Sequence, residues 1–196
     1  DITQLNTIKN KNKNTYKQNG VNLTILPYII KFVSQTLIEL NRFNSSLSDN
    51  EESIYLKDYI NIGIAIDTSK GLVVPNIKNV QDKNLDDIIS DLDILVQKAH
   101  SNKLSPTDFD GGTFTISSLG GLGGTYFTPI INPPEVAILG LSQAKYHNID
   151  ISGKGLEFDS RLIIPYSLSY DHRVIDGVQA VSFTRKLANY IEQYRE

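Results

Sequence analysis

One short segment of the sequence gathers side chains that could carry out acid–base chemistry. Four of them fall within six positions, between a strand-like and a helix-like run: Asp171, His172, Arg173 and Asp176. Charged groups beside a core must be paired or solvated, so a cluster of this kind suits a working site. Imidazole takes up and returns protons near neutral pH, which makes His172 a candidate general base. A helix-capping loop whose charges merely pair with each other is the competing interpretation.

Two adjacent serines, Ser117 and Ser118, end a predicted strand and precede a glycine-rich loop. A hydroxyl at that place could donate a hydrogen bond to a developing oxyanion. The loop lacks the third glycine of a dinucleotide-binding motif, because Tyr126 stands at that position, and it lacks the lysine of a phosphate-binding loop. The serines also lack the glycine-flanked elbow of a serine hydrolase. A tight multiple turn where backbones crowd is the alternative interpretation.

The composition excludes several other classes of site. The chain has no Cys, so disulfides, thiolate metal sites and a cysteine nucleophile are ruled out. Its other histidines, His100 and His147, are predicted surface residues, and we expect no metal. With 19 Lys+Arg against 22 Asp+Glu, the net charge of −3 disfavours nucleic-acid binding. No apolar run approaches the roughly 18 residues of a membrane span, and we expect no membrane association.

The helices that must position these side chains follow from apolar spacings of three and four residues. They are predicted over 24–40, 84–101 and 178–194, with Thr24 and Asn84 as N-caps and Pro27 in a first turn. The first 20 residues form either a surface helix, with Ile2, Leu5 and Ile8 on its apolar side, or a partly disordered segment.

The remaining apolar runs alternate or are continuous, as in strands. Strands are predicted within 54–77, over 113–118, over 135–141 as a central strand, and over 161–170, with a hairpin tip at 149–158. The 196 residues show no internal repeat and no linker. We therefore expect one α+β domain over 1–196, with a large mixed β-sheet flanked by three or four helices.

The segment SLSYDHRVIDG (167–177) contains the pattern H-x-x-x-D-G. It resembles the signature of the dihydrolipoamide acyltransferases, the cores of 2-oxo acid dehydrogenase complexes, and the pattern is shared with chloramphenicol acetyltransferases of the same fold. FNSSL (43–47), YINIGIAIDTSKGLVVPNIKN (59–79) and GGTFTISSLGGLGGTYFTPIINPPEVAILGLS (111–142) match in the same order. The last stretch is similar to the acetyltransferases of pyruvate dehydrogenase complexes. The resemblance implies the two-layer chloramphenicol-acetyltransferase-like fold.

The resemblance also implies a mechanism. His172 would be the general base that removes the thiol proton of coenzyme A, or of dihydrolipoamide in the reverse direction, before the thiolate attacks a thioester. Ser117, rather than Ser118, would donate a hydrogen bond to the oxyanion. Asp176 would match the family's structural aspartate, which shapes the loop through an ion pair with an arginine. The acetyl carriers would be acetyl-CoA and a lipoyl group on a separate domain, with no metal.

The family further implies an active site between subunits of a homotrimer, with serine and histidine from different chains. Trimers would assemble into a larger symmetric core that binds the decarboxylase and dihydrolipoamide dehydrogenase components. We expect the chain to be the catalytic core alone, without the lipoyl and subunit-binding domains or the N-terminal edge of the core. The location would be cytoplasmic in a bacterium and otherwise the matrix of an organelle. The alternatives are an O-acetyltransferase like the chloramphenicol enzymes and a non-catalytic scaffold core.

Overall fold

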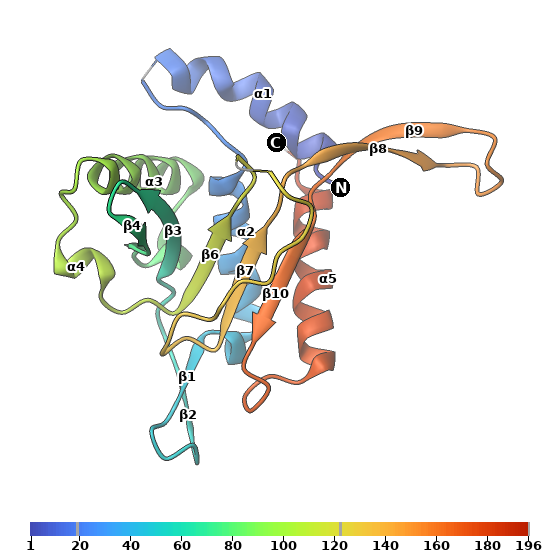
Figure 1. The fold of residues 1–196 in the computed structure, drawn as a ribbon. Helices are drawn as coiled ribbons and strands as arrows, with labels where there is room; N and C mark the ends of the chain where they lie inside the picture. Colours follow the sequence, from blue (N-terminus) through green and yellow to red (C-terminus); the bar gives the residue numbers. More distant parts are fainter. Residues whose placement is uncertain (19, 122, 196) are drawn as a thin grey trace.

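The computed structural model describes residues 1–18, 20–121 and 123–195. Its centre is a six-stranded sheet with the order β10–β7–β6–β3–β4, in which β5 also pairs with β3 (Figure 1). The strands are β3 (Ile62–Thr68), β4 (Gly71–Val73), β5 (Asn76–Ile77), β6 (Phe114–Ser118), β7 (Ala137–Leu141) and β10 (Tyr166–Tyr170). Strands β3, β6 and β7 are parallel, whereas β4, β5 and β10 are antiparallel to their neighbours. The expected mixed sheet with a central strand over 135–141 is confirmed.

Two hairpins lie outside this sheet. The first joins β1 (Ser45–Leu47) to β2 (Ile54–Leu56), and the second joins β8 (Lys145–Asp150) to β9 (Phe158–Ile163). In Figure 1 the β8–β9 hairpin stands away from the body as an arm, and β1–β2 extends from the opposite end of the molecule. The sequence predicts one long strand over 161–170, which is wrong, because β9 ends before Pro165 and β10 begins after it. Proline has no N–H to continue a ladder.

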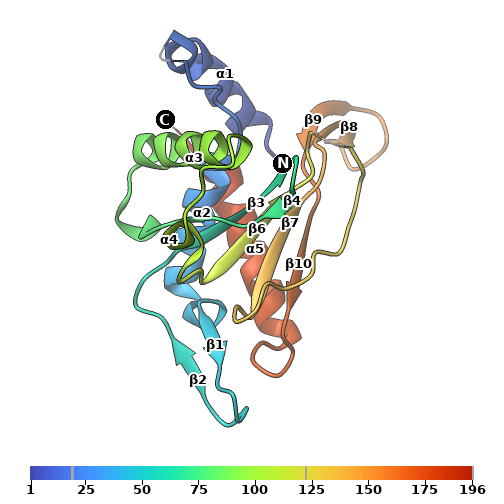
Figure 2. The same cartoon turned by 60° about the vertical axis from the view of Figure 1, so that its left-hand side comes forward.

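Helices cover one face of the sheet. These are α2 (Leu26–Glu39), α3 (Leu85–His100) and α5 (Gly177–Gln193), together with the short elements α4 (Pro106–Phe109), η1 (Asn41–Phe43) and η2 (Val80–Asp82). Figures 1 and 2 show α2 and α5 side by side behind the strands. Phe114 and Ile116 of β6 point to this side and are fully buried. Part of the chain between β6 and β7 lies on the opposite face of the sheet. The molecule therefore has a sheet layer and a helix layer, and the sheet face away from the helices is covered by loop rather than by helices.

The polar N-terminal segment is helical, which decides between the two alternatives for it. Helix α1 spans Thr3–Gln18 and buries Leu5 and Ile8, and Ile2 just before it is 1% exposed. The Ile2 N–H donates to the carbonyl of Leu162 in β9 at 2.8 Å. This narrow apolar side is enough to dock the helix, although most of its other residues face solvent.

The predicted helix starts are partly right. Asn84 caps α3, accepting from the N–H of Asp87 at 2.9 Å, and Pro27 lies in the first turn of α2. The prediction of Thr24 as the N-cap of α2 is wrong. Ile25 already has helical φ and ψ angles of −73° and −26° and holds the cap position, because its carbonyl accepts from two N–H groups of the next turn. Among the described residues, no helix has the length and apolarity needed to cross a membrane.

Candidate active site

The loop that follows β10 presents His172 at the surface. The Asp171 N–H donates to the carbonyl of Val136 at 2.8 Å, which ties the loop to the start of β7. Asp171 also pairs with Arg173, 2.6 Å from Oδ2 to Nη2, and Arg173 contacts Glu51 in the turn between β1 and β2. These hydrogen bonds from Arg173 hold the pKa of Asp171 below its usual range. Both neighbours of His172 are therefore anchored while the imidazole is exposed, with its ring centroid 5.6 Å from that of Tyr170.

Asp176 has a defined structural task. Its Oδ1 accepts from the N–H of Gln179 at 2.8 Å, and the side chain of Gln179 accepts from the N–H of Asp176 at 3.0 Å. This reciprocal pair is a capping box that starts helix α5 directly after the histidine loop. Asp176 thus fixes where the loop ends.

Ser117 and Ser118 face opposite sides of the sheet, as neighbours in a strand must. Ser118 continues the side of Phe114 and Ile116 that faces the helices, whereas Ser117 shares the other side with Thr115. In the ladder Ser117 stands opposite Ala65 of β3 and Gly140 of β7. Its hydroxyl therefore lies on the sheet face that the helices leave uncovered.

The structure does not bring Ser117 and His172 together within one chain. Ser117 is level with Gly140, and Gly140 is level with Ser167 of β10. Tyr170 is three residues further along β10, so two strand spacings and about 10 Å of strand put it about 14 Å from Ser117. His172 lies two residues beyond Tyr170. Contact between these two side chains would need a second chain.

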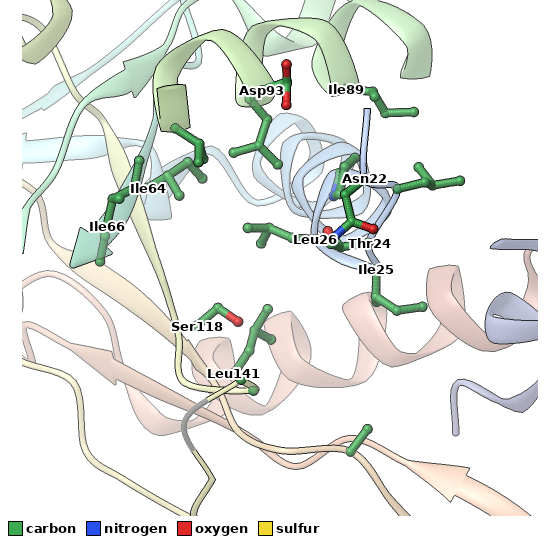
Figure 3. A pocket seen from close by; sticks show the side chains of 18 of the residues that line it. Asn22, Thr24, Ile25, Leu26, Ile64, Ile66, Ile89, Asp93, Ser118 and Leu141 are labelled. Atoms are coloured by element: carbon green, nitrogen blue, oxygen red, sulfur yellow. The ribbon is translucent and has the colours of Figure 1, made fainter. Parts of the chain in front are cut away.

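A cavity of about 840 Å³ opens on the helix side of the sheet, at the carboxyl ends of the parallel strands. Figure 3 shows Ile64 and Ile66 of β3, Ser118 of β6 and Leu141 facing this space, with α2 behind it. Segment 21–27, one side of α3 and residues 142–144 supply further walls. Thr24, which does not cap its helix, is one of the lining residues.

The lining of this cavity is mostly aliphatic. Its charged groups are the carboxylates Asp67 and Asp93, with His100 also present, and the described lining residues include no Lys or Arg. The cavity suits an uncharged, extended ligand group better than a phosphate group, because a phosphate would meet no permanent positive charge there. Of the two adjacent serines, Ser118 lines the cavity and Ser117 does not. His100 and His147 are both exposed, as predicted.

The sequence reasoning did not single out Glu135, which precedes β7 and is only 7% exposed. Its Oε1 accepts a hydrogen bond from Thr115 Oγ1 at 2.9 Å. Burial raises the pKa of Glu135 to about 7, although hydrogen bonding from Thr115 opposes the rise. The sequence signal is weak: Glu135 directly precedes a continuous apolar run, which places it beside the core without showing that it is buried. In the described part of the chain, no three His, Cys, Asp or Glu residues are grouped so as to hold a metal ion.

Comparison with known families places the whole chain in one of them. Residues 1–196 match the description "2-oxoacid dehydrogenases acyltransferase (catalytic domain)". The dihydrolipoyllysine-residue acetyltransferase component of the pyruvate dehydrogenase complex of Buchnera aphidicola subsp. Schizaphis graminum is 46% identical over 198 residues, covering 100% of this chain and 48% of the relative. The same component from Azotobacter vinelandii is 45% identical over 195 residues, covering 100% of this chain and 30% of the relative. The chain thus spans less than half the length of these relatives.

Solved structures agree with this placement. A structure of Azotobacter vinelandii dihydrolipoamide acetyltransferase, from work on the role of a serine, a histidine and an asparagine in its catalytic mechanism, has a TM-score of 0.93 and 45% identity, covering 98% of this chain and 78% of that one. The cubic core of a pyruvate dehydrogenase multienzyme complex gives the same values. A chloramphenicol acetyltransferase has a TM-score of 0.59 at 17% identity, covering 91% of this chain and 81% of that one, and so shares the fold. The chain belongs to the 2-oxoacid dehydrogenase acyltransferase family, with residues 1–196 matching the model of its catalytic domain.

Proposed function

We propose that the chain transfers an acetyl group between the thiols of dihydrolipoamide and coenzyme A, as the core of a pyruvate dehydrogenase complex. The observation that carries this proposal is the 45% identity and TM-score of 0.93 to the Azotobacter enzyme, in which a serine, a histidine and an asparagine four residues after the histidine are the subject of mechanistic work. In this chain Asp176 stands four residues after His172. Asparagine and aspartate are both strong N-cap residues, so either would start α5 in the same way.

The proposed chemistry needs one base and one hydrogen-bond donor. His172 takes the proton from the incoming thiol, and the thiolate sulfur attacks the carbonyl carbon of the other partner's thioester. The carbonyl electron pair moves to oxygen, where the Ser117 hydroxyl donates to the oxyanion. When the carbonyl re-forms, the second sulfur leaves with its bonding electrons and takes the proton back from the imidazolium. No net proton is gained or lost, so the same groups work in both directions.

A homotrimer would supply what one chain lacks. Because Ser117 and His172 stand at different ends of the sheet, we propose that the serine of one subunit meets the histidine of the next. Trimers would then assemble into a larger symmetric core, as in the cubic core of the related complex. The decarboxylase and dihydrolipoamide dehydrogenase would be its partner enzymes, and a lipoyl group on another domain would be its acyl carrier. The location we propose is the bacterial cytoplasm or, in a eukaryote, an organelle matrix.

The test is a panel assay of the purified assembly. Acetyl-, succinyl- and branched acyl-CoA would each be offered with free dihydrolipoamide, and acetyl-CoA with chloramphenicol as an alcohol acceptor. We expect the highest kcat/KM for acetyl-CoA with dihydrolipoamide. A preference for the alcohol would identify an O-acetyltransferase instead. A folded trimer without turnover on any pair would identify a scaffold.

A further inference from the structure

Glu135 is a buried carboxyl group that the proposed mechanism does not use. Thr115 donates to its Oε1, while its Oε2 is buried and has no hydrogen-bond partner among the described residues. The side chain of Asn132 faces the group and favours its ionised form without completing a hydrogen bond to Oε2. An ionised carboxylate with one bare oxygen is costly inside a protein. The environment therefore favours the neutral acid.

Two glycines let the backbone approach this pair closely. A Cβ placed on Gly112 would lie 3.0 Å from Glu135 Oε1, and one on Gly63 would lie 2.9 Å from Thr115 Oγ1. The hydroxyl and the carboxyl are thus packed directly against the backbone of β3 and of Gly112, two residues before β6. The group is held in one place and is not a surface carboxyl that happens to be covered.

The carboxyl lies on the same face of the sheet as the proposed oxyanion donor. Thr115 and Ser117 are two residues apart on β6 and point the same way, which separates their Cα atoms by about 7 Å. With the hydrogen bond of 2.9 Å from Thr115 to Glu135, the carboxyl is within on the order of 10 Å of the Ser117 hydroxyl. A negative charge there would repel the oxyanion, because the space between them is partly shielded from solvent.

We propose that Glu135 is a positioning residue that supports acyl transfer as a neutral carboxylic acid, holding Thr115 and β6 in place while keeping negative charge away from the oxyanion beside Ser117. The inference rests on the proposed function for its oxyanion. What it adds to that function is that ionisation of the Glu135 carboxyl slows acetyl transfer. At an effective dielectric constant of about 20, one charge at about 10 Å slows a step that develops negative charge on the order of tenfold.

Glu135 titrates in a pH range where the effect of its ionisation on the rate of acetyl transfer can be measured. Burial is the largest influence on it and raises its pKa to about 7, whereas the hydrogen bond from Thr115 and the nearby side chain of Asn132 lower it. The groups around it are Thr115 on β6, Asn76 on β5, Gly112 and Asn132, and none of them is charged. The acid is therefore neutral below about pH 7 and becomes ionised above it, so activity should fall on the alkaline side.

The experiment compares the pH dependence of kcat for acetyl transfer between acetyl-CoA and dihydrolipoamide from about pH 6 to about pH 9. In the wild-type assembly we expect a fall on the order of tenfold above about pH 7. Glu135→Gln, which stays neutral, should lack this fall. Thr115→Val removes a donor that favours the ionised form, so its fall should move to higher pH. The matched control is Glu52→Gln, an exposed glutamate in the β1–β2 turn, which should keep the wild-type fall.

An infrared measurement tests the protonation directly and does not depend on activity. Among the described carboxyl groups whose pKa is shifted, Glu135 is the one whose pKa is raised, and the pKa values of the others are lowered. The carboxylic acid C=O band at about pH 6 should therefore belong to Glu135, disappear near pH 7, and persist to higher pH in Thr115→Val. The infrared measurement tests the protonation of Glu135 even if the Glu135→Gln variant does not assemble.

The inference is overturned if no protonated carboxyl is detected at about pH 6, or if Glu135→Gln and Thr115→Val show the wild-type alkaline fall unchanged. Absence of transfer by the wild-type assembly at every pH would instead contradict the proposed function. In that case a normal infrared titration of Glu135 would show that its protonation is as described while its link to catalysis is lost.

Discussion

Ser117 and Gly140 stand directly opposite each other in the parallel pair β6–β7, and the ring of Phe127 covers Gly140. A Cβ at Gly140 would lie 2.7 Å from Cζ of that ring and 3.1 Å from Cγ of Pro129. The segment that leads from β6 to β7 therefore folds back onto the sheet beside the serine. Only a residue without a side chain allows this approach, and the aromatic ring becomes a wall next to the hydroxyl.

Gly140→Ala should push Phe127 away from this position. Forcing a methyl group into a filled space costs about 1–3 kcal/mol of unfolding free energy, and the wall beside Ser117 should shift with it. We expect a lower urea midpoint and a lower kcat. Gly121→Ala is the matched control, because nothing lies within 4 Å of a Cβ there. Equal effects of the two substitutions would show that the contact with Phe127 does not matter.

His172→Ala should lower kcat by at least ~10² with little change in the KM for acetyl-CoA. A general base acts in the transition state, whereas the substrates are held by many other contacts. Steady-state kinetics of the assembled protein provide the measurement, with the exposed His147→Ala as control. A variant of His172 that keeps more than about half the rate would exclude it as the base.

Ser117→Ala should reduce kcat by roughly 10²–10³-fold, which is about 3–4 kcal/mol of transition-state stabilisation. Substrate binding should hardly change, since a thioester carbonyl carries little charge before attack. Ser118→Ala should cost less than about tenfold, because its hydroxyl faces the cavity on the helix side. If the two effects are reversed, the cavity lined by Ser118 holds the reacting groups.

Activity should depend on assembly. We expect that His172→Ala and Ser117→Ala trimers, each inactive, regain some activity after they are dissociated, mixed and reassembled. In mixed trimers some interfaces pair an intact serine with an intact histidine. Native mass spectrometry would confirm mixing, and an acetyl-transfer assay would follow recovery. Mixed trimers that stay inactive would place both residues of a site in one chain.

Asp176→Ala should lower the free energy of unfolding by about 0.5–2 kcal/mol, because it removes the cap of α5. Asp176→Asn keeps an oxygen that can accept from the Gln179 N–H, so its loss should be only a few tenths of a kcal/mol. Urea unfolding of both variants measures the difference. Equal losses would mean that the charge of Asp176, and hence an ion pair, matters more than the cap.

The elements could be predicted where one local pattern decided them. Asn84 before an amphipathic run predicted the start of α3, and the continuous apolar run up to Leu141 predicted a central strand. The prediction of Thr24 as the N-cap of α2 failed because the first turn is set by backbone hydrogen bonds to the carbonyl of Ile25, and no side-chain pattern indicates these bonds. Pro165 divides a run that reads as one strand, because its missing N–H outweighs apolar periodicity.

The residue types of the candidate site follow from sequence patterns, whereas the separation of the serine from the histidine was expected only from the family resemblance. His172 and Ser117 could be chosen from motifs, and strand alternation separates Ser117 from Ser118. That the first two lie far apart depends on the strand order, which comes from pairings between distant segments. The place of Glu135 directly before an apolar run hints at its burial, but its missing hydrogen-bond partner depends on the tertiary packing and is not visible in a single sequence.

The parallel pairing that carries Ser117 has a consequence for how the protein folds. The Asn61 N–H donates to Thr113 Oγ1 across 52 positions of sequence, at the point where β3 and β6 begin to pair. Parallel pairs of this kind close long loops before they gain contact energy, whereas a hairpin such as β8–β9 forms from neighbouring residues. The arm can therefore form from local contacts alone, whereas the place of the Ser117 hydroxyl is fixed only when the long-range pairing of β3 and β6 is made. Catalytic competence thus depends on contacts between distant segments, although the hairpin does not.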